Sequence, residues 1–175
     1  MDALLIVGHQ PWAKGARNHD TDLYEFDFNL PVVLAVQAGL TLLGVDATVD
    51  MYARGGGNVD RWNQMNARLV VEFHCNAFNE QATGTEVLYG TGRANSRKAA
   101  RHIQSALVTE LGLPDRGTKG VKRKGRGGYL LHGITAPCVI PEPFFIDNRN
   151  DLQRAEGANL TGAYVEGICN ALEAL

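Results

Sequence analysis

Four side chains of the types that bind metal ions and transfer protons lie where elements of the expected fold begin or end. They are His9, Glu25, His74 and Glu142. Both histidines and Glu142 come just after short apolar runs that are typical of buried strands, and Glu25 lies in the first turn of an expected helix. Because the ends of neighbouring elements meet at one edge of a sheet, we expect these four side chains to converge.

Two histidines and one carboxylate are a known ligand set of catalytic zinc ions. Three protein ligands leave the fourth tetrahedral position to water, and a second carboxylate nearby can serve as general base. A net charge of about +1 keeps such a centre a Lewis acid and lowers the pKa of bound water to about 7. The sequence contains no compact His-Glu-x-x-His helix, so each histidine can equally be a hydrogen-bonded, partly buried residue, and both interpretations stay open.

The stretch 69–77 organises the middle of the chain. Residues 69–73 indicate a buried strand, and His74 and Asn76 follow two positions apart, which places both side chains on one face of an extended chain. Asn76 can bind a substrate or orient a metal ligand, or it can cap its own backbone in a turn. Glu72 lies on the same face of the extended chain. It can be a partner of His74, an alternative carboxylate at the site, or a solvated side chain.

Strands alternate with helices along the chain, and this alternation predicts one α/β domain over residues 1–175. We expect a twisted, mostly parallel or mixed sheet of about six strands flanked by helices. The expected strands cover residues 3–7, 45–50, 69–73, 85–89, 129–132 and 138–140, and the expected helices cover 22–43, 59–67, 96–111 and 151–175. Glycine-rich loops are expected at 54–57 and 115–128.

The composition is that of a globular protein, with 45% apolar and 21% charged residues. The formal net charge of −2 gives no basic field that would attract nucleic acid or a membrane surface. A basic run without any acid nevertheless extends between positions 116 and 126, and its cations are Arg116, Lys119, Lys122, Arg123, Lys124 and Arg126. This run can bind carboxylates or an anionic polymer, or it can be a solvated charged loop.

The N-terminus has no basic region and only a short apolar run, so we do not expect a signal peptide. No stretch approaches the ~20 apolar residues of a membrane span. The cysteines Cys75, Cys138 and Cys169 are too widely spaced for a zinc knuckle, and their odd number argues against a disulfide framework. We expect Cys75 and Cys138 to be small core residues of a chain made in a reducing cytoplasm.

Several segments match, in order, the motifs of one enzyme family. They are Val7-Gly8-His9, Glu25 followed by Asn29-Leu30, His74-Cys75-Asn76-Ala77, Gly84-Thr85-Glu86-Val87, Arg116-Gly117-Thr118-Lys119, and a closing segment from Pro137 to Asn148. On these residues the chain resembles the zinc-dependent N-acetylmuramoyl-L-alanine amidases of the type-3 class, which occur in bacterial autolysins and phage endolysins. Glu72 replaces the family's serine, and Phe144 stands where glycine is usual.

The resemblance implies one zinc ion per chain, held by His9, Glu25 and His74, with Glu142 as the catalytic glutamate. The implied reaction is hydrolysis of the amide between N-acetylmuramic acid and the L-alanine of the stem peptide by a zinc-activated water. The implied partner is bacterial peptidoglycan. Glu86, on the expected strand 85–89, is expected to take no part in the chemistry.

Substrate-binding roles are expected for residues near this implied site, namely Asn76, His132 and Arg126. Asn76 shares a face with His74, His132 shortly precedes the Glu142 segment, and Arg126 closes the basic run. These residues are polar or cationic and suit a substrate that carries peptide amides and carboxylates.

We also expect residues 1–175 to be the catalytic domain of such an amidase, without a separate cell-wall-binding domain, either as a compact single-domain enzyme or as a catalytic domain taken from a longer protein. Because no signal peptide is expected, we expect a phage or prophage endolysin that is made in the cytoplasm and acts on the cell wall after release. Two alternatives stay open. One is a related zinc carboxypeptidase or peptidase, and the other is a non-catalytic peptidoglycan-binding module.

Overall fold

The computed structural model describes residues 1–51 and 58–175, so the glycine-rich loop expected at 54–57 lies outside the described residues. Within them, six strands form one sheet in the order β2-β1-β3-β6-β4-β5. Four neighbouring strands run parallel: β2 (Ala47–Asp50), β1 (Ala3–Val7), β3 (Leu69–Phe73) and β6 (Cys138–Glu142). The other two, β4 (Thr85–Gly90) and β5 (Asp115–Val121), are parallel to each other, and β4 pairs with β6 in the antiparallel direction. The predicted α/β fold with a mixed sheet is confirmed.

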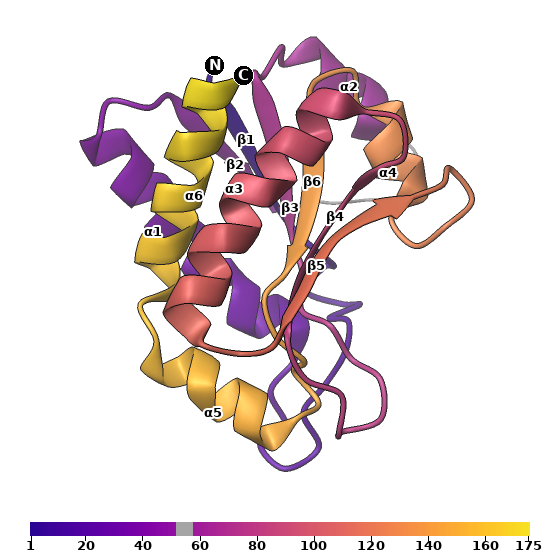
Figure 1. Cartoon of the computed structure of the whole chain (residues 1–175), viewed down its shortest axis with the longest axis vertical. Coiled ribbons are helices and arrows are strands. Elements are labelled where there is room, and N and C mark those ends of the chain that lie inside the picture. The colour runs from indigo at the N-terminus through magenta and orange to yellow at the C-terminus, as the bar shows by residue number, and fades with distance from the viewer. Residues whose placement is uncertain (52–57) are drawn as a thin grey trace.

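Long helices cover one face of the sheet, and short helices lie on the other (Figure 1). The long ones are α1 (Glu25–Leu42), α3 (Ala94–Leu111) and α6 (Leu160–Ala174). The short ones are α2 (Val59–Gln64) and α4 (Gly128–Gly133), while α5 (Arg149–Gly157) lies at the lower end of the molecule in Figure 1. Helices α2 and α4 have six residues each, so they cover less of the sheet than the long helices of 15 to 18 residues do.

Strand β1 is buried on both faces and anchors the site that follows it. Leu5 and Val7 belong to the core under the long helices, whereas Leu4 and Ile6 pack in the core under α2 and α4. Each of these four side chains has no solvent exposure, as expected for an apolar run in a largely parallel sheet. Burying each one stabilises the fold by roughly 1.5–3 kcal/mol, so the point where β1 ends is well defined.

Residues 129–132 belong to helix α4, so the strand expected there is wrong. Leu130 and Leu131 are buried against the second core, and Gly127, with φ of +69°, turns the chain into the helix. The segment Tyr129-Leu130-Leu131 contains no β-branched residue, and leucine is a good helix former. A short apolar run fits a strand or a helix equally well, and here the glycine turn decides for the helix.

The first half of the loop expected at 115–128 is also wrong, because residues Asp115–Val121 form β5. Strand β5 is the last strand on its side of the sheet, and most of its side chains are exposed or half-buried. Such edge strands often carry lysines and lack the apolar alternation by which strands are recognised. Its register against β4 skips Arg116, because Thr85 pairs with Asp115 and Glu86 pairs with Gly117.

The C-terminal segment forms two helices where one was expected. Helix α5 ends at Gly157, and Asn159 caps α6 by accepting a hydrogen bond from the backbone N–H of Gly162. The first long helix begins at Glu25, three residues later than the expected helix start, and contains Pro31. The other expected strands and helices are confirmed, with small differences at their ends.

The cysteines behave as the sequence predicts within the described residues. Cys75 and Cys138 are buried, and all three cysteines are free thiols. Among the described helices, none has the length and apolar character needed to cross a lipid bilayer.

Candidate active site

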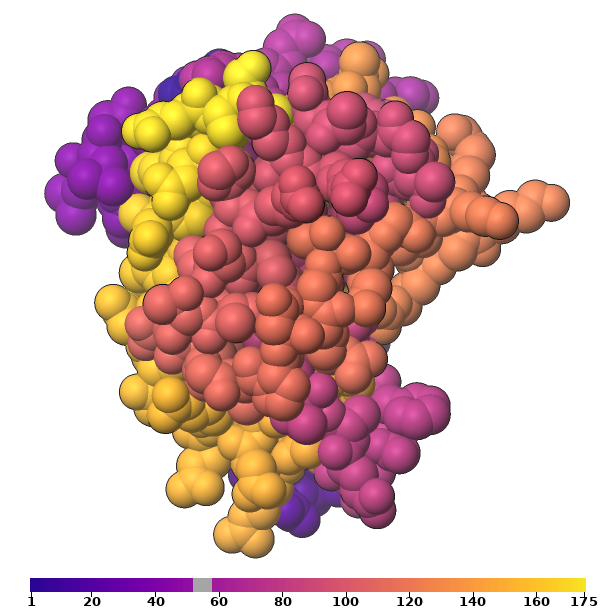
Figure 2. Space-filling view, in the orientation of Figure 1, coloured from indigo at the N-terminus to yellow at the C-terminus, as the bar shows by residue number. Residues whose placement is uncertain are grey.

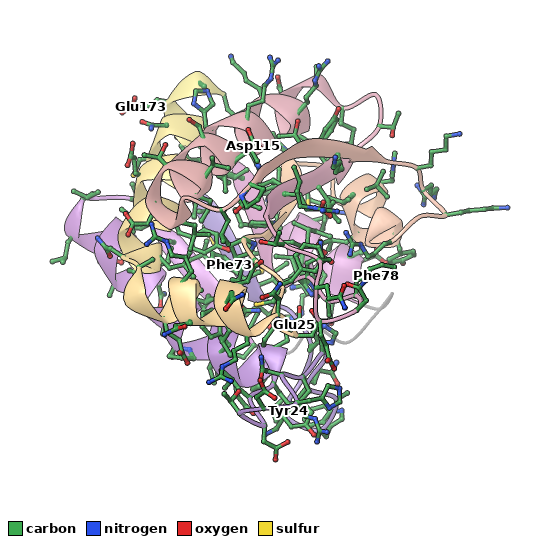
Figure 3. The ribbon with its side chains drawn as sticks, turned by 60° about the horizontal axis from the view of Figure 1, so that its bottom comes forward. Tyr24, Glu25, Phe73, Phe78, Asp115 and Glu173 are labelled. Atoms are coloured by element: carbon green, nitrogen blue, oxygen red, sulfur yellow. The ribbon has the colours of Figure 1, made fainter. Side chains whose placement is uncertain are left out.

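A cavity of about 370 Å³ opens at the carboxyl ends of β1, β3 and β6, on the face that carries the short helices. Its polar lining comes from His9, Glu25, Glu72, His74, Arg126 and Glu142. Figure 3 turns the lower end of the molecule toward the viewer and marks Glu25 at the start of α1 and Phe73 at the end of β3. The cavity therefore brings together His9, Glu25, His74 and Glu142, the four side chains that were expected to converge.

His9 leaves β1 in a strained backbone conformation. Its φ of +67° lies in the left-handed region, which residues other than glycine rarely adopt and which is frequent at functional sites. Gly8 permits a close approach to β3, because a Cβ there would lie 2.5 Å from the carbonyl oxygen of Phe73 and 2.6 Å from Cε1 of His74. The imidazole rings of His9 and His74 consequently lie with their centres 4.9 Å apart.

Glu25 is the first residue of α1, where the helix dipole favours a negative charge. Its Oε1 accepts a hydrogen bond from the backbone N–H of Cys75 at 2.8 Å and lies 2.8 Å from Nδ1 of His74, while its Oε2 lies 3.0 Å from Nε2 of His9. Burial opposes ionisation, but the hydrogen bonds with His74 and His9 outweigh it and hold the pKa of Glu25 well below its usual range. The carboxylate is therefore ready to act as a ligand.

Gly15 brings the loop after β1 over these groups. A Cβ at this position would lie 2.5 Å from Cδ2 of His9 and 2.6 Å from Oε2 of Glu25, and the backbone φ is +82°. Both the close approach and the left-handed conformation require glycine here.

His74 lies between two carboxylates at the end of β3. Its Nδ1 contacts Glu25, and its Nε2 lies 3.3 Å from Oε2 of Glu72. Burial disfavours the imidazolium, but the negative charge of Glu72 and the contacts with both carboxylates raise the pKa of His74 well above its ordinary value. Of the roles left open for Glu72, the structure places it as a partner of His74.

His9, Glu25 and His74 each bring a donor atom to within 4.8 Å of the others. A tetrahedral zinc ion with bonds of about 2.0–2.2 Å separates its donor atoms by about 3.3–3.6 Å, so small side-chain adjustments would fit the donors to an ion. Two imidazoles and one carboxylate are also the donor chemistry of catalytic zinc sites. The three residues therefore form a possible metal-binding triad.

Glu142 ends β6 in the same cavity and is 4% exposed. Burial raises the pKa of its carboxyl to about 8, against the opposing effects of the positive charges on Arg126 and His74. Nη2 of Arg126 lies 2.7 Å from Oε2 of Glu142, but the contact lacks hydrogen-bond geometry, and Oε2 accepts no hydrogen bond from the described residues. A buried carboxylate with a pKa near neutrality is suited to general acid–base catalysis.

Sequence reasoning missed Glu86, which strand pairing places opposite Glu142. It is 4% exposed and accepts hydrogen bonds from Asn76, Arg126 and Arg116. Glu86 lies on a strand, as expected, and it does not line the cavity, but it contacts Arg126, which does. The antiparallel pairing of β4 with β6 places Glu86 beside Glu142, and no motif in the sequence predicts this pairing.

The three candidate substrate-binding residues have different surroundings. Arg126 lines the cavity. Asn76 is 4% exposed, and its amide donates to Glu86 and accepts from Arg126. His132 is not among the residues that line the cavity, and its Nε2 lies 2.8 Å from the carbonyl oxygen of Val121.

A family model described as N-acetylmuramoyl-L-alanine amidase matches residues 4–174. The chain belongs to this amidase family. The resemblance on which the sequence analysis relied is thereby confirmed, and the match includes all four of His9, Glu25, His74 and Glu142.

Curated relatives include members that are longer than this amidase-family chain. An uncharacterized cell wall amidase of Bacillus anthracis is 34% identical over 137 residues, which are 69% of this chain and 25% of that protein. N-acetylmuramoyl-L-alanine amidase LytC of Bacillus subtilis (strain 168) is 28% identical over 158 residues, which are 86% of this chain and 30% of LytC. The chain therefore spans less than a third of the length of these two relatives.

Solved structures share the fold of this amidase-family chain. An N-acetylmuramoyl-L-alanine amidase from Clostridium difficile 630 has a TM-score of 0.85 and 22% identity, covering 99% of this chain and 95% of that one. The catalytic domain of the CD27L endolysin has a TM-score of 0.83 and 24% identity, covering 97% of each chain. The mixed sheet with its flanking helices is thus a fold found in amidase catalytic domains.

Proposed function

We propose that this chain hydrolyses the amide between N-acetylmuramic acid and the L-alanine of the stem peptide in bacterial peptidoglycan. The observation that carries the proposal is the convergence of His9, Glu25 and His74 in a cavity that also contains the buried Glu142. Family membership indicates the bond that is cut, and the cavity supplies metal donors together with a proton acceptor.

In this proposal His9, Glu25 and His74 hold a zinc ion, the metal typical of the family. When bound, the ion polarises the scissile carbonyl and lowers the pKa of water to about 7. The ionised Glu25 and the two imidazoles supply one oxygen and two nitrogen donors. Glu72, in contact with His74, orients its imidazole ring.

Glu142 moves the proton in this proposal. Its Oε2 takes a proton from the attacking water and returns it to the departing amine of L-alanine. This oxygen accepts no hydrogen bond from the described residues, and Nη2 of Arg126 lies 2.7 Å from it, so the guanidinium charge favours the ionised carboxylate that accepts the proton. Burial raises the pKa of this carboxyl to about 8 in the metal-free cavity, and the positive charge of a bound metal ion would lower it and so favour the ionised form that accepts the proton.

Arg126 is proposed to bind the substrate. Its guanidinium reaches the cavity from the turn before α4, and its Nε has no partner among the described residues. A guanidinium suits the carbonyl and carboxylate oxygens of a stem peptide. Asn76 serves this role through Arg126 and not by direct contact with the substrate, because its amide is already engaged.

The reaction can be tested by digesting purified peptidoglycan with zinc-loaded protein and analysing the products by mass spectrometry. We expect stem peptides with a free N-terminal L-alanine, glycan strands that keep the lactyl group, and about one zinc per chain. A chelator should stop the reaction, and added zinc should restore it. Release of a C-terminal amino acid would instead indicate a carboxypeptidase, and wall binding without products would indicate a non-catalytic module.

Two further parts of the proposal concern the biological setting. One is that the protein acts as an endolysin on the wall after release from the cell that makes it. The other is that residues 1–175 act as the catalytic domain of the enzyme. The likeness in fold to an endolysin catalytic domain is compatible with both.

A further inference from the structure

A single guanidinium joins two carboxylates on neighbouring strands. Glu86 of β4 and Glu142 of β6 are paired positions of an antiparallel ladder. Like charges at paired positions repel each other unless a cation lies between them. Nη2 of Arg126 is that cation, because it lies 2.9 Å from Oε1 of Glu86 and 2.7 Å from Oε2 of Glu142.

Glu86 is the carboxylate of this pair that is fully hydrogen-bonded. Its Oε1 accepts from Nδ2 of Asn76 at 3.0 Å and from Arg126, and its Oε2 accepts from Nε of Arg116 at 2.8 Å. Burial opposes its ionisation, but Arg116 and Arg126 outweigh burial and lower the pKa of Glu86. Glu86 is thus a fixed anion, whereas Glu142 keeps an oxygen free of hydrogen bonds from the described residues.

Asn76 closes a triangle with Glu86 and Arg126. Its Nδ2 donates to Glu86, and its Oδ1 accepts from Nη1 of Arg126 at 3.1 Å. Asn76 lies two residues after His74, so the triangle also connects Arg126 to the loop that carries a proposed metal ligand. Each member of the triangle holds the other two, and such networks stabilise one arrangement of their side chains.

We propose that Glu86 is a positioning residue of the amidase reaction, holding the Arg126 guanidinium and the Asn76 amide so that Glu142 and Arg126 face the substrate correctly. This role rests on the function proposed above. Glu86 is not among the residues that line the cavity, so it acts through Arg126. Without Glu86, the long side chain of Arg126, which is 56% exposed, would sample many rotamers.

A double-mutant cycle tests this role with a soluble disaccharide–tetrapeptide muropeptide as substrate. Glu86→Gln keeps the shape of the side chain and removes its charge, and we expect kcat to fall about 10- to 100-fold because the reacting groups are misplaced. Arg126→Gln removes the guanidinium that Glu86 positions, so in this variant Glu86 should no longer contribute to kcat. The combined variant should therefore be no slower than Arg126→Gln alone, because the two residues act as one unit. Effects that multiply would overturn the proposal, as would a Glu86→Gln variant with the kcat of the wild type.

Arg68→Gln is the matched control. It removes a half-exposed guanidinium that pairs with Asp2 away from the cavity and leaves Glu86, Arg126, Asn76 and Glu142 in place, and we expect its kcat to change by less than about 3-fold. Zinc content and the unfolding midpoint are measured for each variant, and we expect zinc content to be unchanged.

A second variant covers the case in which Glu86→Gln does not fold. Glu86→Asp keeps the charge but shortens its reach, so its loss of kcat should be intermediate and again should not add to that of Arg126→Gln. Additive losses with this variant would equally overturn the role of Glu86. A wild-type protein that releases no N-terminal L-alanine would instead refute the reaction itself, and the role with it.

Discussion

Glu142 combines deep burial with an oxygen that accepts no hydrogen bond from the described residues. Replacing it with glutamine removes the proton acceptor and leaves the shape of the side chain unchanged. We therefore expect Glu142→Gln to lower kcat by about 10²–10⁴-fold, the usual contribution of general acid–base catalysis. Its zinc content, measured by elemental analysis, should stay at the wild-type level because none of the proposed ligands is changed. Loss of zinc together with activity would contradict this division of roles.

The same carboxyl makes stability depend on pH in the direction opposite to an ordinary salt-bridged glutamate. Burial raises its pKa from 4.5 to about 8, so the folded state binds this proton more tightly than the unfolded state does. The resulting stabilisation is complete below about pH 4.5 and is lost as the pH rises through about 8.

Metal-free Glu142→Gln, which cannot ionise at this position, should therefore match the wild type near pH 4 and be more stable than the wild type near pH 9. The difference at high pH can reach about 5 kcal/mol, at 1.36 kcal/mol per pKa unit. Urea unfolding at the two pH values measures it. A wild type that equals or exceeds the variant at high pH would contradict the raised pKa.

At the scale of elements, the loop after β1 depends on Gly15 for its passage over His9 and Glu25. Gly15→Ala should lower metal affinity, because the new Cβ would collide with both proposed ligands. Gly92→Ala is a matched control, since Gly92 has the same φ of +82° but no atom within 4 Å of the added Cβ. Both variants should lose about 1–3 kcal/mol of stability from backbone strain, and only Gly15→Ala should lose zinc in a competition titration with a chelator. Equal metal affinities would contradict the steric role of Gly15.

The elements that could be predicted are those whose residues report burial directly. The apolar runs of β1 and β3 indicate strands covered on both faces, and the polar residues that follow them mark the site edge. Strand β5 escaped prediction because it is a polar edge strand that is held by backbone pairing with β4. Helix α4 was not predicted because its short leucine-containing run fits the periodicity of a strand as well as that of a helix. Glu86 was missed for a related reason, since cross-strand neighbours depend on topology and not on local sequence.

At the scale of the whole molecule, charge is distributed unevenly despite the net value of −2. The segment between β5 and α4 projects from the body of the molecule (Figure 2). We call the exposed cations of this segment and of the end of β5 the basic ridge, which consists of Lys119, Lys122, Arg123 and Lys124. None of these four side chains forms an ion pair within the described parts of the chain.

The basic ridge should strengthen binding to cell walls that carry anionic polymers. Replacing all four cations by glutamine should slow hydrolysis of such walls and make the rate less sensitive to salt, because the attraction is screened over about 8–10 Å at physiological ionic strength. The variant should hydrolyse cell walls that lack anionic polymers, and soluble muropeptides, at close to the wild-type rate. Turbidity assays across a salt series measure both effects. An unchanged salt dependence would indicate that the basic ridge is merely solvated.

The position of β6 between β3 and β4 has a consequence for biosynthesis. The proposed metal ligands emerge from the ribosome within the first 74 residues, whereas Glu142 arrives on the last strand of the sheet to be made. Until that strand inserts, the pair β4–β5 cannot join the rest of the sheet, and Glu86 has no partner strand on its other side. A nascent or truncated chain that ends before β6 can therefore gather its proposed metal donors, but it lacks Glu142, and its Glu86 has no β6 to pair with. The proposed site is complete only after β6 has been made and has inserted into the sheet.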